Sequence, residues 1–194
     1  MKVCVIGVGY WGIKHVDEYI QLGHDVIICD KSQENIKNCK ERFDTVEVKN
    51  LETILNEKEV TCVSICTPND THYDIASKCL IARKHVFLEK PMSTNIEDAD
   101  KLIELSERNN VILQVGHIYR FNNSVQKARE LINNLELGHI YSVNFSWTNF
   151  EPVFNDKEII LDLGIHPVDI IDNIFCGDYE NIKCRGWGFR QKNT

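Results

Sequence analysis

The chain has 194 residues, 43% hydrophobic and 26% charged, which is ordinary for a globular protein with one large domain or a full domain plus a smaller one. Its formal net charge of -7 argues against a nucleic-acid partner, because phosphate contacts need a basic face. Apolar runs stay short of the roughly 18 residues of a membrane span, and the first strand-like run begins too early for a signal peptide. We therefore expect a cytoplasmic protein without a membrane partner.

The eight cysteines of the chain indicate buried thiols rather than disulfides. Cys4, Cys29, Cys62 and Cys66 fall inside apolar, strand-like runs, where cysteine behaves as a small hydrophobic residue. No C-x-x-C pair occurs, and the last two of these cysteines stand in an extended run rather than a zinc-binding turn. We expect reduced cysteines and no metal site.

In chain order, the sequence first predicts a strand at 2–6 that ends at the glycines of GVGYWG. Gly7 allows a tight turn, Gly9 lets the backbone approach a pyrophosphate, and Gly12 lets the next helix pack closely. A strand, this spacing and a helix are together typical of dinucleotide binding, and an ordinary strand-to-helix turn is the alternative. The cofactor-binding residues expected in this stretch are Gly7, Gly9, Tyr10, Trp11 and Gly12.

A helix is expected over about 11–22 and a second strand over 25–29, which ends at Asp30. An acidic residue at this position accepts hydrogen bonds from the adenosine ribose hydroxyls, which favours NAD. The 2′-phosphate of NADP would be repelled by the carboxylate, although Lys31 beside it keeps NADP as the second choice. The alternative is that Asp30 caps a helix that begins near Ser32.

Strands and helices continue to alternate up to Gly116. Strands are expected at 45–48, 60–66, 85–88 and 111–115, and helices at 32–43, 50–57, 70–82 and 95–109. Helices between strands imply parallel pairing, so the predicted class is α/β, a Rossmann-type doubly wound parallel sheet with helices on both faces. The ligand should lie at the carboxyl edge of the sheet, where TPNDTH (67–72) and EKP (89–91) follow two strands.

Five motifs together resemble the glucose-fructose oxidoreductase and inositol dehydrogenase family, Gfo/Idh/MocA. They are GVGYWG at 7–12, CTPNDTH at 66–72, EKP at 89–91, GHIYRFN at 116–122 and DLGIHPVD at 162–169. Their wording is most similar to the nucleotide-sugar branch, such as UDP-N-acetylglucosamine 3-dehydrogenases. The resemblance implies an NAD-dependent oxidoreductase that transfers a hydride between nicotinamide and a hydroxyl carbon of a sugar or nucleotide sugar, such as C3 of a UDP-N-acetyl sugar.

The resemblance also implies catalytic residues. Lys90 matches the family lysine between nicotinamide and substrate, and Asp162 and His166 match its catalytic aspartate and histidine. Histidine suits a base near neutral pH, a lysine steadies a developing alkoxide, and the aspartate orients its neighbours. The alternatives are a surface lysine at position 90 and a helix cap at His166, because Pro167 disfavours the α conformation before it.

Further contacts follow from the same motifs. The cofactor-binding residues implied by the resemblance are Thr67, Pro68, Asn69, His72, Glu89 and Lys90, and the substrate-binding residues are His117, Arg120 and Asn122. The expected domains are an NAD-binding Rossmann domain at 1–118 and a partial substrate or oligomerisation domain at 119–194. The second domain is expected to be a small, incomplete α+β unit with an open antiparallel sheet.

The elements expected in this second domain are a helix at 123–136, strands at 139–149 and 180–190, and a helix at 165–175. The helix at 165–175 carries apolar residues nearly all round and should be buried between the domains. If it begins at Pro167, Asp162 and His166 do not share an i,i+4 face, and the sequence leaves this open.

The two strands alternate apolar and polar residues, so one sheet face must be covered, and we expect a homo-oligomer, either a dimer or a tetramer. Two functions remain for the whole chain. Lys90, Asp162 and His166 favour an enzyme, whereas the short second part favours a non-catalytic NAD-binding subunit or sensor.

Overall fold

The computed structural model of the protein describes residues 1–148, 159–175 and 179–186. The chain divides into two compact units, a first unit of residues 1–116 and a second unit from residue 117 onward. Among the helices in the described residues, each is too short or too polar to cross a membrane.

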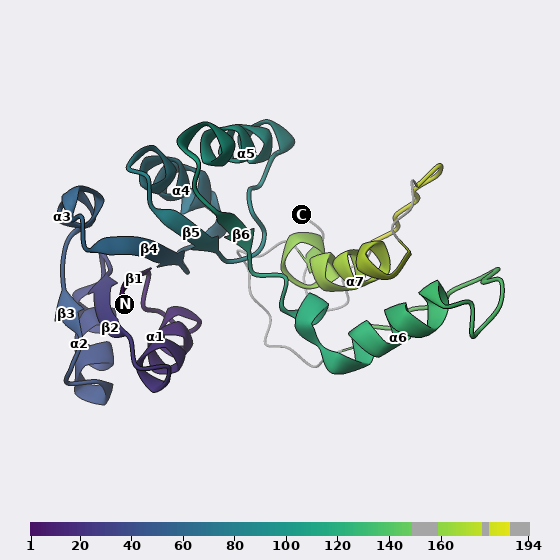
Figure 1. Ribbon diagram of the computed structural model, residues 1–194, viewed down its shortest axis with the longest axis horizontal. Helices are drawn as coiled ribbons and strands as arrows, with labels where there is room; N and C mark the ends of the chain where they lie inside the picture. Colours follow the sequence, from purple (N-terminus) through teal and green to yellow (C-terminus); the bar gives the residue numbers. More distant parts are fainter. Residues whose placement is uncertain (149–158, 176–178, 187–194) are drawn as a thin grey trace. The chain divides into compact units, whose positions relative to one another are not determined.

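The first unit is built on a sheet of parallel strands (Figure 1). The strands are β1 (Lys2–Ile6), β2 (Asp25–Cys29), β3 (Glu47–Val48), β4 (Val60–Ile65), β5 (His85–Leu88) and β6 (Leu113–Val115). Their order is β3-β2-β1-β4-β5-β6, and every neighbouring pair is parallel. The order changes direction between β1 and β4, which is the switch point of a Rossmann fold. The predicted α/β class and doubly wound sheet are confirmed.

Helices cover both faces of this sheet. They are α1 (Gly12–Gln21), α2 (Gln33–Arg42), α3 (Leu51–Asn56), α4 (His72–Ile81) and α5 (Ile96–Asn109). Successive side chains of a strand point to opposite faces. Val5 of β1 therefore packs in one cluster with Val16 of α1, whereas Cys4 packs in the other with Leu80 of α4 and Leu102 of α5. Both clusters are closed to water, so the sheet is a rigid support for the loops at its edges.

Capping residues explain where several of these helices begin. The side chains of Ser32, Asn50 and Asn95 accept hydrogen bonds from backbone N–H groups in the first turns of α2, α3 and α5. Such caps satisfy donors that have no partner within the helix. Gly23, with φ of +76°, follows α1 in the left-handed conformation that glycine adopts easily. The predicted helices thus have the expected order, with ends that lie within a few residues of the expected ones.

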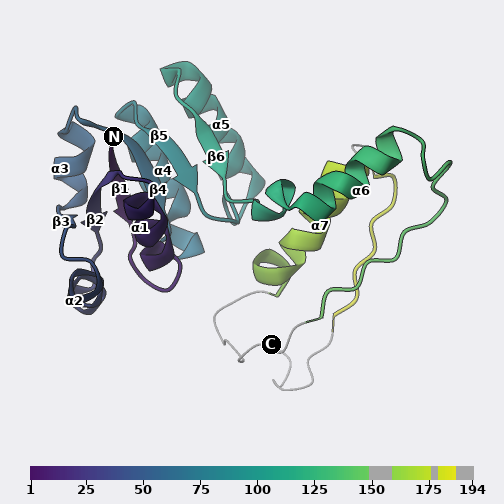
Figure 2. The ribbon, with the colours of Figure 1, turned by 60° about the horizontal axis from the view of Figure 1, so that its bottom comes forward.

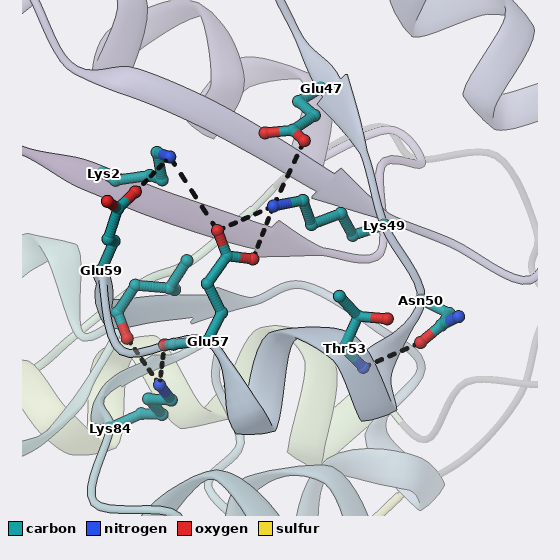
Figure 3. A network of polar contacts seen from close by, with 9 residues as sticks. Lys2, Glu47, Lys49, Asn50, Thr53, Glu57, Glu59 and Lys84 are labelled. Atoms are coloured by element: carbon teal, nitrogen blue, oxygen red, sulfur yellow. Dashed lines mark hydrogen bonds and ion pairs between the residues drawn. The ribbon is translucent and has the colours of Figure 1, made fainter.

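A buried lysine ties α3 and β4 to the start of β5 (Figure 3). Lys84 is 5% exposed, and its Nζ donates to the carbonyl oxygens of Glu57, at 2.5 Å, and Val60, at 2.7 Å. Burial lowers the pKa of Lys84 below its ordinary value of 10.5. Beside it, the Glu57 carboxylate accepts from Lys49 Nζ at 2.6 Å. These contacts fix the chain on the side of the sheet where β4 begins.

The second unit holds a pair of helices that lie side by side (Figure 2). Its helical segments are η2 (Ile118–Phe121), α6 (Asn123–Asn133), η3 (Ile160–Gly164) and α7 (Ile165–Phe175). The η3 segment is a π-helical turn that leads directly into α7. α6 begins where the helix predicted at 123–136 begins, but it ends at Asn133, before residue 136.

The expected strands of the second unit are wrong over the described residues, because 139–148 and 179–186 contain no strand. Alternation of apolar and polar residues indicates which face would be buried but supplies no pairing partner. Residues 149 and 187–190 of the expected strands lie outside the described residues. The antiparallel sheet is therefore absent from the part of the second unit that the structure describes.

The predicted helix at 165–175 is confirmed as α7, which continues directly from η3, so Pro167 lies inside a helical segment and the restriction that it places on His166 is overcome. One expectation about this helix needs correction. The helix was expected to be buried on all sides by its apolar residues. Instead, the apolar Val168 is 60% exposed, while the polar Asp169 and Asn173 are buried. Charged and polar partners within the second unit explain the buried Asp169, as described below.

Candidate cofactor-binding and active site

The loops of the candidate site begin in line along the carboxyl edge of the sheet. Backbone hydrogen bonds continue one residue past the strands, from Gly7 N to Cys29 O at 2.7 Å and from Cys66 N to Ile6 O at 2.8 Å. The same pattern joins Glu89 N to Ile65 O at 3.0 Å. The GVGYWG, TPNDTH and EKP motifs therefore leave the sheet side by side at its switch point, where Rossmann folds bind ligands.

The three glycines of the first loop differ in what surrounds them. A Cβ on Gly12 would lie 1.8 Å from the carbonyl oxygen of Gly7, and one on Gly7, whose φ is +85°, would lie 2.8 Å from Thr67 Cγ2. A Cβ on Gly9 would meet only Asn35 Nδ2, at 3.9 Å. Gly7 and Gly12 are thus required by the fold, whereas the backbone at Gly9 is open to a ligand.

Asp30 binds the glycine loop to the end of β2. Its Oδ2 accepts from Val8 N at 2.7 Å and from Asn35 Nδ2 at 3.1 Å, and its Oδ1 accepts from Ser32 N at 2.8 Å. The cap of α2 is Ser32, whose hydroxyl accepts from the N–H of Asn35. A carboxylate offers about four acceptor positions, so Asp30 keeps capacity for a donor from a ligand.

Two aromatic side chains stand on the surface of the glycine loop. Tyr10 and Trp11 contact each other edge to face, with ring centroids 5.4 Å apart, and both are exposed. The Nζ of Lys14 lies 4.1 Å from the ring centroid of Tyr10 and 4.0 Å from that of Trp11. A cation over aromatic faces is attracted by the ring quadrupoles, which orders this exposed corner. Lys31, the residue after Asp30, is also exposed.

The TPNDTH loop folds as a short turn over η1 (Asn69–Thr71). Thr71 Oγ1 donates to Pro68 O at 2.7 Å and to Thr67 Oγ1 at 2.8 Å. His72, which opens α4, is fully buried. Its ring nitrogens lie 2.8 Å from Pro91 O and 2.9 Å from Thr67 O. His72 therefore joins this loop to the EKP segment and lies inside the protein.

Glu89 of the EKP segment is held by a histidine that sequence reasoning missed. His15 of α1 places its Nε2 3.1 Å from Glu89 Oε1 and its Nδ1 2.9 Å from Ser64 Oγ. In the sequence, His15 is marked only by its position three residues after Gly12, and this position does not indicate which residue it contacts. Lys90 follows Glu89 and is half-buried, and Pro91 is buried.

In the second unit, His166 is part of an aromatic cluster. Its ring stacks on Trp147, with centroids 5.6 Å apart and planes at 28°, and meets Tyr119 edge to face at 5.1 Å. Tyr119 and Trp147 contact each other at 5.1 Å, so the three rings fix one another. Asp162 lies four residues before His166 in the continuous η3 and α7 segment, which is the spacing that places two side chains on one helical face. Sequence reasoning did not single out Tyr119 or Trp147, because their contact joins positions far apart in the sequence.

The residues expected to bind substrate hold the second unit together. Arg120 Nε donates to Asp169 Oδ1 at 2.7 Å, and its guanidinium reaches Asp172 at 3.3 Å. His117 Nδ1 lies 3.5 Å from the same Asp169 oxygen. Asn122 caps α6, since its Oδ1 accepts from Ser124 N and Val125 N. These contacts join two of the motifs, GHIYRFN and DLGIHPVD, and explain why the carboxylate of Asp169 is buried.

Among the described residues, no group of three or more His, Cys, Asp or Glu side chains is placed to hold a metal ion. The described cysteines are free thiols, and burial raises the pKa of Cys66 and Cys79 to about 12. Thiols with such pKa values are poor nucleophiles at neutral pH. The chemistry of the site therefore depends on other side chains.

The strand order, the glycine loop and the carboxylate at the end of β2 define a dinucleotide-binding protein of the Rossmann class. Residues 1–117 match the oxidoreductase family with an NAD-binding Rossmann fold, GFO_IDH_MocA, and residues 125–193 match the C-terminal domain of the GFO/IDH/MocA family. The chain belongs to this family, and the resemblance found in the sequence is confirmed. NAD is the cofactor of the family fold in residues 1–117.

The relatives whose activities are named are longer than this chain. It is 27% identical over 194 residues to myo-inositol 2-dehydrogenase of Thermotoga maritima, covering 96% of this chain and 58% of that protein. It is 29% identical over 174 residues to UDP-N-acetylglucosamine 3-dehydrogenase of Acidithiobacillus ferrooxidans, covering 88% and 53%. A solved oxidoreductase structure from Bacillus subtilis matches with a TM-score of 0.80 and 28% identity, covering 90% and 52%. The chain thus spans about half the length of the relatives it matches.

Proposed function

We propose that the protein is an NAD-dependent oxidoreductase that transfers a hydride between nicotinamide and a hydroxyl carbon of a sugar or nucleotide sugar. The observation that carries this proposal is the meeting of three features at one sheet edge in a member of this family. These are the open backbone at Gly9, the carboxylate of Asp30, and the EKP segment with Lys90, which His72 contacts at Pro91 O. The relatives named above favour inositol or UDP-N-acetyl sugar substrates, and C3 of a UDP-N-acetyl sugar is the specific proposal.

The residues of the first unit fit a dinucleotide. A pyrophosphate would lie against Gly9 and the N-terminal N–H groups of α1, and Asp30 would accept bonds from the ribose hydroxyls. The proposed cofactor-binding residues are Gly7, Gly9, Tyr10, Trp11, Gly12, Asp30, Lys31, Thr67, Pro68, Asn69 and Lys90. NAD is preferred over NADP because a 2′-phosphate would meet the Asp30 carboxylate, whose oxygens are fixed by Val8 and Ser32.

Bound NAD would supply the hydride acceptor, and the side chains would manage the hydroxyl proton. His166 takes this proton as general base, Lys90 stabilises the developing negative charge on the oxygen, and Asp162 orients the base or a neighbouring hydroxyl. The rings of Tyr119 and Trp147 keep the imidazole of His166 in one orientation. His117 is retained as a substrate contact, whereas Arg120 and Asn122 act by holding the helices of the second unit.

The test compares Lys90→Ala and His166→Ala with the unchanged protein. If both residues act mainly in the transition state, kcat falls by about two orders of magnitude or more while NAD affinity changes little. Lys58→Ala, which removes an exposed lysine at the opposite edge of the sheet, where β4 begins, is the control for loss of positive charge. Turnover like that of the unchanged protein in both variants would end the catalytic proposal and favour a non-catalytic NAD-binding subunit.

The buried free thiols of Cys4 and Cys79 suit a reducing compartment, so we place the protein in the cytoplasm as part of this proposal. A homo-oligomer is proposed as well, on the apolar side chains that the second unit exposes.

A further inference from the structure

The segment that carries Lys90 is held from both faces of the sheet by two histidines. His72 opens α4, which packs in the cluster with α5, and His15 lies in α1, which packs in the opposite cluster. One ring reaches the main chain at Pro91 and the other reaches the side chain of Glu89. The two contacts therefore lie on either side of Lys90 in the sequence.

The buried ring of His72 acts on backbone groups only. Its ring nitrogens face the carbonyl oxygens of Pro91, at 2.8 Å, and Thr67, at 2.9 Å. A carbonyl oxygen can only accept and a neutral imidazole carries one N–H, so the neutral ring donates to one of these oxygens and meets the other as a close contact. Because the nitrogens lie at opposite edges of a rigid ring, this side chain fixes the spacing between the loop after β4 and the turn after β5. His72 is thus removed from the proposed cofactor contacts.

The ring of His15 acts on a side chain. With hydrogen on Nε2, it donates to Glu89 Oε1 at 3.1 Å and accepts from the hydroxyl of Ser64 at Nδ1, at 2.9 Å. Ser64 is fully buried in β4, so it gives the hydrogen bonds from Ser64 through His15 to Glu89 a fixed starting point. A Cβ on Gly116 would lie 3.1 Å from the same Glu89 oxygen, which shows how closely the carboxylate is enclosed.

We propose that His72 and His15, the latter through Glu89, are positioning residues for Lys90. The inference rests on the function proposed above for this lysine. A lysine carries its ammonium group on a long side chain, so the position of its backbone sets which atoms that group can reach. A misplacement of about 1 Å can cost on the order of 100-fold in rate, so a segment that is held on both sides of Lys90 is useful next to a reacting oxygen. The role differs from cofactor binding, in which Glu89 and His72 would face the nucleotide.

The test uses His72→Leu and His15→Leu, with His85→Leu as the matched control. His85 begins the same strand, β5, and its Nδ1 accepts from Ile112 N at 3.0 Å, so it also ties β5 to the backbone but at the end away from Lys90. Hydrogen exchange of the peptide covering residues 89–93 is measured on the full chain without substrate. We expect exchange there to be about tenfold faster in both test variants, with β1 and β2 unchanged, and no such effect in the control.

Kinetics at saturating NAD give the second measurement. In both test variants kcat should fall by about tenfold or more while the KM for substrate changes little, because the substrate contacts remain. His72→Gln, which keeps one donor group, should recover part of this loss and replaces His72→Leu if the latter does not fold.

The proposal is overturned if exchange at 89–93 in the test variants equals that of the unchanged protein, or rises equally over the whole first unit. Failure of the proposed function would look different, since the unchanged protein would then show no turnover at all. In that case the exchange measurement alone decides whether the histidines hold the segment.

Discussion

At the scale of single residues, the three glycines of the first loop have separate duties that mutation can distinguish. Gly12→Ala places a methyl group 1.8 Å from the carbonyl oxygen of Gly7, so α1 must move. We expect a loss of about 3 kcal/mol or more in the free energy of unfolding, measured by urea denaturation.

Gly9→Ala is the complementary change, because its added methyl group meets no protein atom closer than 3.9 Å. The variant should fold with nearly unchanged stability but bind NAD about tenfold or more weakly, since the methyl group occupies the space where the pyrophosphate approaches. Isothermal titration with NAD measures this. Normal NAD affinity in a folded Gly9→Ala variant would remove the glycine loop from the cofactor site.

Asp30 allows a test of cofactor choice. Asp30→Ala removes the carboxylate that would repel a 2′-phosphate, so the preference for NAD over NADP should shrink by about tenfold. The fluorescence of Trp11, which lies on the glycine loop that Asp30 contacts through Val8, reports both titrations. Asp25→Ala, an exposed aspartate at the other end of β2, should leave the preference as it is. Equal affinities for the two nucleotides in the unchanged protein would refute the ribose assignment.

At the scale of elements, Lys84 is the joint between α3, β4 and the start of β5. Lys84→Met leaves the buried carbonyl groups of Glu57 and Val60 without these two hydrogen bonds, and we expect a loss of about 2 kcal/mol in the free energy of unfolding at neutral pH. Urea denaturation measures this loss. Lys58→Met, an exposed lysine in the same turn, should change stability by less than about 0.5 kcal/mol.

The pH dependence of the same variant has a definite sign. The pKa of Lys84 is lowered in the folded state, so the unfolded chain holds this proton more tightly. The contribution of Lys84 to stability is therefore lowest below the folded-state pKa and rises as the pH approaches the ordinary value of 10.5. Lys84→Met should lack this rise. A variant whose stability follows the same alkaline trend as the unchanged protein would contradict the assignment.

Comparison of elements also shows what the sequence could predict. The first unit was predictable because several of its apolar runs and helices are bounded by a glycine or a capping residue, and because helices between strands impose parallel pairing. In the second unit, the run at 139–148 has strand-like alternation but no strand pairing in the described residues. Pairing is a property of two segments, so periodicity within one of them cannot establish it.

The candidate site, like the fold, was predictable only in part. Gly9 and Asp30 were predictable from the spacing of a motif, whereas the partners of Glu89 and His166 were not. His15 reaches Glu89 and Trp147 stacks on His166 across long stretches of chain, through contacts that exist only in the folded protein. The structural duties of Arg120 and Asn122 were missed for the same reason.

At the scale of the whole molecule, the described part of the second unit exposes apolar side chains close together in the sequence. Tyr141 is 91% exposed and Val143 is 51% exposed. Such residues on a soluble protein often mark an interface, so we expect a two-fold dimer. Light scattering at micromolar concentration should give the mass of a dimer.

Val143→Glu should shift this assembly toward the monomer, because a charge in an apolar interface is costly. Ile96→Glu, which changes an exposed apolar residue of the first unit, is the control and should leave the mass unchanged. A soluble monomer of the unchanged protein would refute the expected assembly without affecting the proposed chemistry.

Hydride transfer itself is the most direct test of the central claim. The protein is incubated with NAD and a panel of inositols, sugars and UDP-N-acetyl sugars that carry deuterium on the carbon to be oxidised. We predict that one class of substrate gives deuterated NADH, detected by mass spectrometry, together with the corresponding ketone. If a protein that binds NAD forms no deuterated NADH with any member of the panel, the proposed oxidoreductase activity is contradicted.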